Sequence, residues 1–245
     1  MQLIRIINRI TPPFLWDIAR DWVGHADTDS IQPFVHDSVR SYSQYGEDLV
    51  LDALLGCQDE GFYVDIGAND PEVLSNTLRF YQRGWHGINV EPNSVLADEF
   101  RRRRPDDINL NVGIASQAGD LTFYRMEPST LSTFDQDAVT DNLEHPGARL
   151  IEETRVAVEP LTRVLDAHLD GRSIDFLSVD TEGFDLFVLQ SNDWLRYRPR
   201  LVLVEVAWKP SEIVEYLGTQ GYVMVWSNGV NGIFADDDQP LGPQI

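Results

Sequence analysis

Short apolar stretches alternate with longer amphipathic stretches along most of the chain from Ser43 onward. The apolar stretches have the continuous hydrophobicity of strands buried on both faces, and the segments between them carry apolar residues at helical spacing. The expected strands are 61–66, 87–91, 108–114, 174–180 and 201–206, and the expected helices are 74–83, 94–103, 183–190 and 211–220. This pattern predicts an α/β fold, in which a mostly parallel sheet is covered by helices on both faces as a three-layer sandwich.

Beyond Tyr222 the chain alternates apolar and polar residues, and Asn228-Gly229 and Asn231-Gly232 are turn signals. This part predicts a C-terminal antiparallel hairpin that closes the sheet. Two segments interrupt the alternation of strands and helices: a hairpin-like piece at 120–126 and a polar stretch at 127–153. Because long loops at strand ends often shape substrate sites, we expect the polar stretch to determine which substrate is bound.

Residues 1–40 differ from the rest and predict an N-terminal helical extension ahead of a domain at 41–245. Leu3, Ile4, Ile6, Ile7 and Ile10 recur at helical spacing with arginines between them, which breaks up the apolar run that a signal peptide needs. Two interpretations stay open. Residues 1–23 rest peripherally on a membrane surface, or the extension packs on the domain or on a second subunit in a homo-oligomer.

The formal charge of -21 at pH 7 excludes one class of partner. Such an acidic surface repels phosphate backbones, so we expect no nucleic acid partner. Four arginines at 101–104 are explained by the end of a predicted helix, where cations complement the helix dipole. Cys57 is the only cysteine, which we expect to be a buried thiol, and nothing implies an oxidising compartment, so we expect a cytoplasmic protein.

Ligands of open parallel sheets bind outside the carboxyl ends of the strands, and the first strand-to-helix loop reads Val64-Asp65-Ile66-Gly67-Ala68-Asn69-Asp70. Gly67 and Ala68 let the backbone approach a ligand closely, but the three-glycine dinucleotide fingerprint is missing. A pyrophosphate would meet the carboxylate of Asp65, whereas a positive sulfonium without phosphate would not. The loop therefore favours S-adenosylmethionine over a nicotinamide dinucleotide.

Glu91 ends the next expected strand, where an acidic residue hydrogen-bonds the two hydroxyls of an adenosine ribose. Asn93 two residues later also suits a helix N-cap, and the two roles are compatible. The third expected strand should place Gly113 and Ile114 near the adenine edge. These signals occur in the order and spacing of an adenosine site.

Together these residues resemble the FkbM family of S-adenosylmethionine-dependent methyltransferases. The matching segments are 43–48 (SQYGED), 65–70 (DIGAND), 75–77 (SNT), 84–87 (GWHG), 90–93 (VEPN) and 175–183, which ends in DTEG. The resemblance implies a Rossmann-like class I methyltransferase fold with a seven-stranded sheet, and an O-methyltransferase whose acceptor is a hydroxyl, often of a sugar or glycan. It also implies cofactor-binding roles for residues on these motifs, namely Gln44, Asp65, Gly67, Ala68, Asn69, Ser75, Asn76, Glu91, Pro92, Asn93 and Asp180. Pro71 departs from the family pattern, in which glycine is frequent at this position.

Deprotonation of the acceptor hydroxyl needs a base or a metal ion, and the sequence offers candidates for both. Asp180 and Glu205 end two expected strands, and Glu182 follows Asp180, so the three carboxylates should share one crevice. They are candidate ligands of Mg²⁺ or Mn²⁺. In the alternative, Asp180 binds the amino group of the cofactor and Glu182 caps a helix, and Asp180 or Glu182 is the base.

Three further residues are candidates for the site. Glu47 opens an expected helix, where it either completes a capping arrangement with Ser43 or acts near the methionine end of the cofactor. His145 in the polar stretch is a candidate for substrate contact or base, and Trp208 is the aromatic residue best placed to stack on a sugar. The alternatives to methyl transfer are a nicotinamide-dependent sugar oxidoreductase or epimerase and a non-catalytic binding module on the same fold.

Overall fold

The structure is a computed structural model that describes residues 40–239 of the chain. The expected helical extension, with its membrane or subunit contact through residues 1–23, lies outside the described residues. Within them, no helix combines the length and the apolar character needed to span a membrane.

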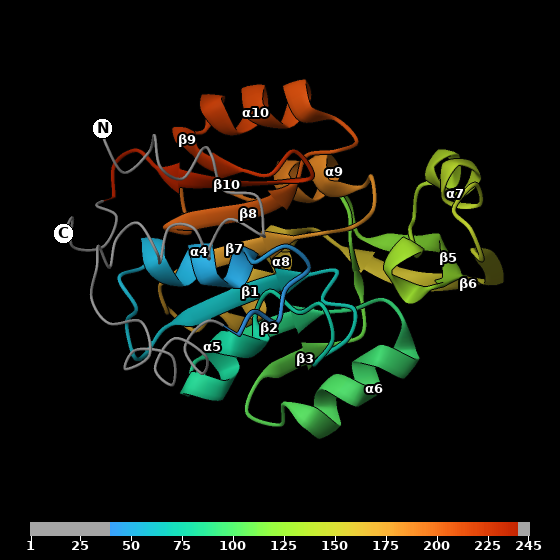
Figure 1. Ribbon diagram of the computed structural model, residues 1–245, viewed down its shortest axis with the longest axis horizontal. Coiled ribbons are helices and arrows are strands. Elements are labelled where there is room, and N and C mark those ends of the chain that lie inside the picture. The colour runs from blue at the N-terminus through green and yellow to red at the C-terminus, as the bar shows by residue number, and fades with distance from the viewer. Residues whose placement is uncertain (1–39, 240–245) are drawn as a thin grey trace, which may run out of the picture.

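The main sheet has seven strands in the order β3-β2-β1-β7-β8-β10-β9, which confirms the predicted α/β architecture (Figure 1). Pairing is parallel from β3 to β8, and β10 runs antiparallel to both β8 and β9. The central strands are buried along their whole length, as expected for strands covered on both faces. The strands of this sheet are β1 (Phe62–Ile66), β2 (His86–Val90), β3 (Ile108–Leu110), β7 (Phe176–Val179), β8 (Leu201–Glu205), β9 (Tyr222–Ser227) and β10 (Asn231–Asp236).

Helices cover the two faces of the sheet and form two apolar cores. Residues of α8 (Leu161–His168), α9 (Asp185–Gln190) and α10 (Pro210–Thr219) pack with β1, β2, β7 and β8 in the larger core. On the opposite face, α4 (Glu47–Leu54) and α5 (Leu78–Arg83) contribute to a second core around Phe80, Trp85 and Phe176. Helix α6 (Ser94–Arg103) lies beside β3, and its N-cap Asn93 accepts a hydrogen bond from the Val95 amide. The sequence pattern did not indicate α8.

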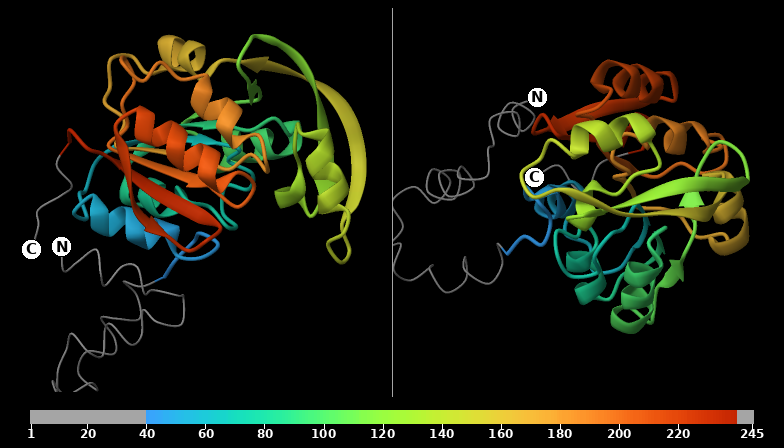
Figure 2. Two further views of the ribbon diagram at one scale, coloured as in Figure 1. Left: turned by 90° about the horizontal axis from the view of Figure 1, so that it is seen from above. Right: turned by 90° about the vertical axis from the view of Figure 1, so that its right-hand side faces the viewer.

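A second sheet projects from this body and corrects the expected strand at 108–114 (Figure 2). Only its first part, β3, lies in the main sheet, because β4 (Gly113–Ile114) turns away to pair with β6 (Arg149–Glu159). The piece expected as a hairpin at 120–126 is instead β5 (Gly119–Glu127), a long strand antiparallel to β6. Between them lie the 3-10 turn η3 (Ser129–Leu131) and helix α7 (Gln136–Asn142).

Three smaller expectations are also corrected. Helix α5 begins at Leu78, four residues after the expected start at 74, because Leu74 has a left-handed backbone with φ 55°. Of the two turn signals in the hairpin, Asn228-Gly229 forms the turn, whereas Asn231-Gly232 lies within β10. Cys57 is exposed, not buried.

Asp52 joins the two helices of the smaller core. Its buried carboxylate accepts hydrogen bonds from Arg79 Nε at 2.8 Å and from Arg83 Nη1 at 2.6 Å. Burial raises the pKa of Asp52, but the hydrogen bonds and charges of Arg83 and Arg79 outweigh burial and lower it below its usual value. The ionised carboxylate therefore stabilises the folded state above the unfolded-state pKa of about 3.9, and this stability is lost as the pH falls through the lower folded-state pKa.

We expect Asp52→Asn to lower the free energy of unfolding by about 1–3 kcal/mol at pH 7, because hydrogen bonds to a charged partner are lost. The difference from the wild type should shrink as the pH falls below about 4, where the carboxylate becomes protonated. Urea unfolding at several pH values measures both effects. Exposed Asp59→Asn is the matched control and should stay within about 0.5 kcal/mol. An Asp52→Asn effect that is constant with pH would contradict the assignment.

Candidate functional site

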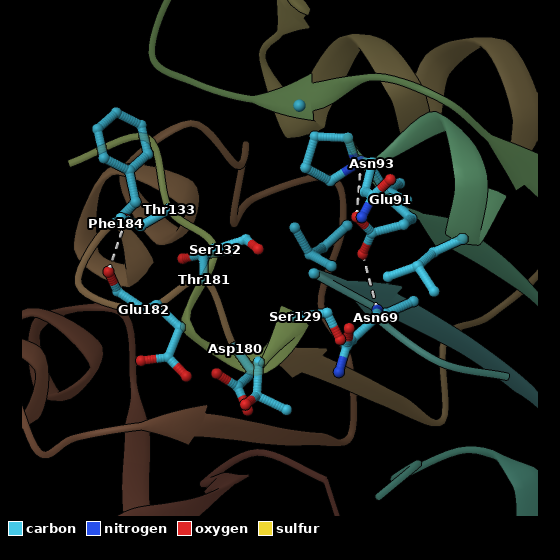
Figure 3. Close-up of a pocket in the computed structure, with 18 of the residues that line it drawn as sticks. Asn69, Glu91, Asn93, Ser129, Ser132, Thr133, Asp180, Thr181, Glu182 and Phe184 are labelled. Carbon is cyan, nitrogen blue, oxygen red and sulfur yellow. Dashed lines mark hydrogen bonds between the residues drawn. The ribbon is translucent and has the colours of Figure 1, made fainter. Parts of the chain in front are cut away.

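One pocket opens at the carboxyl ends of β1, β2 and β7, and residues 129–134 of the projecting part form its opposite wall. Figure 3 shows Glu91 and Asn69 on one side of the pocket and Asp180 and Glu182 on the other. The sequence-predicted cofactor residues that line it are Gln44, Asp65, Gly67, Ala68, Asn69, Asn76, Glu91, Pro92, Asn93, Gly113, Ile114 and Asp180. All of the predicted cofactor residues except Ser75 therefore come together at one site.

The loop after β1 lies tightly between the ends of β2 and β7. The amides of Gly67 and Ala68 both donate to the Val90 carbonyl, at 3.0 and 3.2 Å. Gly67 has φ 77°, and a Cβ built on it would lie 1.9 Å from the carbonyl oxygen of Asp180, so only glycine fits. Asn69 also has a left-handed backbone, with φ 52°, and its buried Oδ1 has no hydrogen-bond partner among the described residues.

Glu91 is buried at the end of β2 and is held in place by two backbone amides. Its Oε1 accepts from Asn93 N at 2.7 Å and its Oε2 from Asn69 N at 2.8 Å (Figure 3). Burial raises the pKa of Glu91 to about 8, although both backbone hydrogen bonds favour the ionised form. The carboxylate is thus fixed in orientation while it faces the pocket.

Asp65, which lines the pocket, is held by a buried hydrogen-bond network. Its Oδ2 accepts a hydrogen bond from Thr77 Oγ1 at 2.9 Å, and Thr77 in turn accepts from Arg104 Nη1 at 2.7 Å. Burial raises the pKa of Asp65, while the Thr77 hydrogen bond and the Arg104 charge oppose this rise. The Ser75 hydroxyl accepts from Arg104 Nη2 at 2.8 Å and from backbone amides, which explains why it does not line the pocket.

Three carboxylates gather beside the pocket, as the positions of Asp180, Glu182 and Glu205 at strand ends predict. One oxygen of each lies within 4.8 Å of the others. Glu182 has a left-handed backbone with φ 52°, and its carbonyl accepts from Thr133 Oγ1 at 2.8 Å. Nearby Asp185, which the sequence reading overlooked, organises the loop by accepting hydrogen bonds from the amides of Thr181 and Gly183.

Burial raises the pKa of all three carboxylates, and neighbouring negative charges raise it further. For Asp180 the neighbouring charges that act are those of Asp185, Asp65 and Glu47, all of which are negative. The Trp208 indole N–H lowers the pKa of Glu182 and Glu205, yet it has no hydrogen-bond partner at direct bonding distance among the described residues. The cluster therefore lacks a compensating positive charge from the described part of the chain.

The other candidates are placed away from the pocket lining. Both carboxylate oxygens of buried Glu47 are occupied: Oε2 accepts from the Tyr45 amide, and Oε1 accepts from Asn228 and Asn231 of the C-terminal hairpin. His145 is exposed after α7, and the structure does not bring it to the pocket. Trp208 stands beside Glu182 and Glu205 and does not line the pocket.

The wall made by residues 129–134 is the part of the site that sequence reasoning located only as a region. It brings four hydroxyl side chains and Phe134 to the pocket. Phe134 contacts both Phe123 and Phe184, with ring centroids 5.0 and 6.0 Å apart, so the wall is fixed to β5 and to the loop before α9. The composition of the polar stretch was the only sequence signal for this wall.

The sheet order, the acidic residue that ends β2 and the glycine loop after β1 define an α/β protein of the methyltransferase class. The model of the methyltransferase FkbM domain matches residues 65–224, which is well over half of the chain. The chain belongs to the FkbM methyltransferase family, as its motifs indicated.

Similar solved structures share little sequence with this chain. Methyltransferase FkbM from Methylobacillus flagellatus KT is 12% identical with a TM-score of 0.46, over 72% of this chain and 44% of that one. This chain thus spans less than half of that protein. A putative caffeoyl-CoA O-methyltransferase from Staphylococcus aureus is 11% identical with a TM-score of 0.44, and the match covers 92% of this chain and 98% of that protein. The METTL16 MTase domain is 15% identical with a TM-score of 0.41, and the match covers 79% of this chain and 67% of that domain. No curated protein matches the sequence.

Proposed function

We propose that the protein is an S-adenosylmethionine-dependent O-methyltransferase that acts on a hydroxyl group of a sugar or glycan. The observation that carries this proposal is the acidic composition of the pocket lining. Asp65, Glu91, Asp180 and Glu182 line it, and no lysine, arginine or histidine does among the described residues. Such a lining suits a cationic ligand without phosphate and disfavours the pyrophosphate of a nicotinamide dinucleotide.

The residues present fit this cofactor. Glu91 would accept from the ribose hydroxyls, and the unpartnered Oδ1 of Asn69 offers an acceptor to a ligand donor. Gly113 and Ile114 would flank the adenine, while Asp180 and Gln44 lie on the lining for the methionine end. When bound, S-adenosylmethionine supplies an electrophilic methyl group: the O–C bond forms as the S–C bond breaks, and the hydroxyl proton leaves to a base.

The pocket residues would position the acceptor oxygen and receive its proton. Methyl transfer depends on in-line alignment and on exclusion of water, which the wall at 129–134 would provide. The hydroxyl side chains of Ser129, Thr130, Ser132 and Thr133 suit a polar acceptor such as a sugar. Asp180 or Glu182 would accept the proton directly, or a divalent cation at the acidic cluster would acidify the hydroxyl.

Calorimetric titration with S-adenosylmethionine and with NADH, each in chelator and in magnesium, tests the cofactor class. Binding of S-adenosylmethionine alone supports the proposal, and binding of NADH alone would favour a sugar oxidoreductase or epimerase. Binding without methyl transfer to any glycan or small-molecule acceptor would favour a non-catalytic module. Absence of S-adenosylmethionine binding in every condition would overturn the proposed function.

We expect Glu91→Gln to weaken S-adenosylmethionine binding by roughly tenfold to a hundredfold, because an acceptor oxygen for the ribose hydroxyls is replaced by an amide NH2 group that cannot accept. Calorimetry on the folded variant measures the effect. Glu99→Gln is the matched control, because Glu99 is partly exposed on α6 and does not line the pocket, and its affinity should equal that of the wild type. Unchanged affinity in Glu91→Gln would mean that the nucleoside binds elsewhere.

A further inference from the structure

The acidic cluster has a geometry that a single cation would explain. Asp180 and Glu205 come from the ends of the neighbouring strands β7 and β8, and Glu182 reaches the cluster through its left-handed backbone. Their oxygens lie within 4.8 Å of one another, whereas two oxygens bound to one Mg²⁺ are at most about 4.2 Å apart. Small side-chain rotations would therefore bring all three oxygens into one coordination sphere.

One carboxylate of this cluster also has a buried oxygen without a partner. Glu205 is 9% exposed, and its Oε2 has no hydrogen-bond partner among the described residues. A buried carboxylate oxygen without a donor is costly and is rarely left unsatisfied. The single lysine nearby, Lys209, lies over the Phe187 ring at 5.3 Å, and the charges that act on Glu205 come from Asp180, Glu182 and Asp185.

We propose that Asp180, Glu182 and Glu205 form a binding site for one hard divalent cation, Mg²⁺ or Mn²⁺. Carboxylate oxygens are the ligands these ions prefer. A divalent cation bound here would favour the ionised form of all three carboxyl groups, and the positive charge that the described side chains do not supply would come from the cation. This inference rests on the proposed function, since it gives the cation the task of activating the acceptor.

The site also constrains the acceptor. A six-coordinate cation that is bound by one oxygen from each carboxylate keeps about three open positions. The acceptor hydroxyl would take one of them, next to the pocket wall of hydroxyl side chains, and a neighbouring hydroxyl of the same sugar would take a second. When bound, the cation lowers the pKa of a coordinated hydroxyl and so assists its deprotonation.

Titration of the chelator-treated full chain with Mn²⁺, followed by loss of the free-ion paramagnetic resonance signal, tests the site without S-adenosylmethionine or turnover. We expect one tight Mn²⁺ per chain that Mg²⁺ displaces. Glu205→Gln and Asp180→Asn should each weaken it by at least about tenfold. Exposed Glu215→Gln on α10 is the matched control for the general acidity of the surface, and it should bind as the wild type does.

The fluorescence of Trp208 gives a second measurement, which does not depend on whether the carboxylate variants fold. Its indole lies close enough to Glu182 and Glu205 to lower their pKa, so bound Mn²⁺ should quench its fluorescence. The quenching should be lost in Trp208→Phe. No stoichiometric Mn²⁺ binding in the wild type, or equal quenching in Trp208→Phe, would overturn the cation site. If S-adenosylmethionine still bound in chelator, the proposed function would stand without it.

Discussion

Replacement of Arg104 by methionine is expected to lower the free energy of unfolding by about 3–5 kcal/mol, which is the cost of removing one partner from a buried charged network. Arg104 is fully buried and donates to the Pro71 carbonyl, to Ser75 Oγ and to Thr77 Oγ1. Its charge also lowers the pKa of Asp65, which is buried close by. Methionine keeps most of the apolar stem but removes the guanidinium donor from all three groups.

Urea unfolding of Arg104→Met measures this effect, and Arg103→Met is its control. Arg103 stands next in sequence, and its side chain is 56% exposed with ion pairs to Glu72 and Glu99. Exposed ion pairs contribute about 0–1 kcal/mol, so this variant should remain near the wild type. Equal stability of the two variants would show that Arg104 does not support the loop at 71–77.

Gly67→Ala is expected to abolish S-adenosylmethionine binding and to destabilise the fold by at least about 3 kcal/mol, because an unavoidable backbone clash adds to left-handed strain. The added methyl group would lie 1.9 Å from the Asp180 carbonyl oxygen. Moving either backbone segment would break a hydrogen bond, because the Asp180 amide donates to the Ile66 carbonyl and the Gly67 amide donates to the Val90 carbonyl. Relief of the clash would separate the glycine loop from the acidic cluster.

Thermal unfolding and calorimetry on Gly67→Ala measure both consequences. Gly119→Ala is the matched control, since a Cβ there meets nothing within 4 Å and its φ is not positive. That variant should unfold within about 0.5 kcal/mol of the wild type and bind the cofactor normally. Wild-type affinity in Gly67→Ala would contradict the placement of the cofactor in this pocket.

The main sheet was predictable because its central strands are buried on both faces. Strand β8 is apolar except for its last residue, Glu205, so the sequence indicates both where the strand lies and where it ends. The same holds for Asp65 and Glu91, which stand at or just after the carboxyl ends of β1 and β2. Parallel topology then brings these ends to one edge, and most of the expected pocket residues follow from that rule.

The projecting sheet was not predictable in the same way. Strands β5 and β6 are mostly half-buried or exposed, and their pairing joins Glu127 to Arg149 across an intervening turn and helix. No local pattern specifies such a partner. The loop before α5 likewise has a distant partner, because the Ser75 hydroxyl accepts a hydrogen bond from Arg104, which lies far along the chain. The hydrogen bond from the distant Asn231 to buried Glu47 likewise has no signature in the sequence.

The residues on the two sides of the pocket come from different parts of the sequence. One wall, residues 129–134, belongs to a single stretch between β4 and the start of α8, whereas the strand ends that carry Asp65, Glu91 and Asp180 lie outside that stretch. Insertions, deletions or exchanges confined to 115–158 would reshape that wall while the sheet edge opposite it keeps its residues. The fold therefore allows selectivity to evolve in one contiguous piece of the gene, independently of the parts that carry Asp65, Glu91 and Asp180.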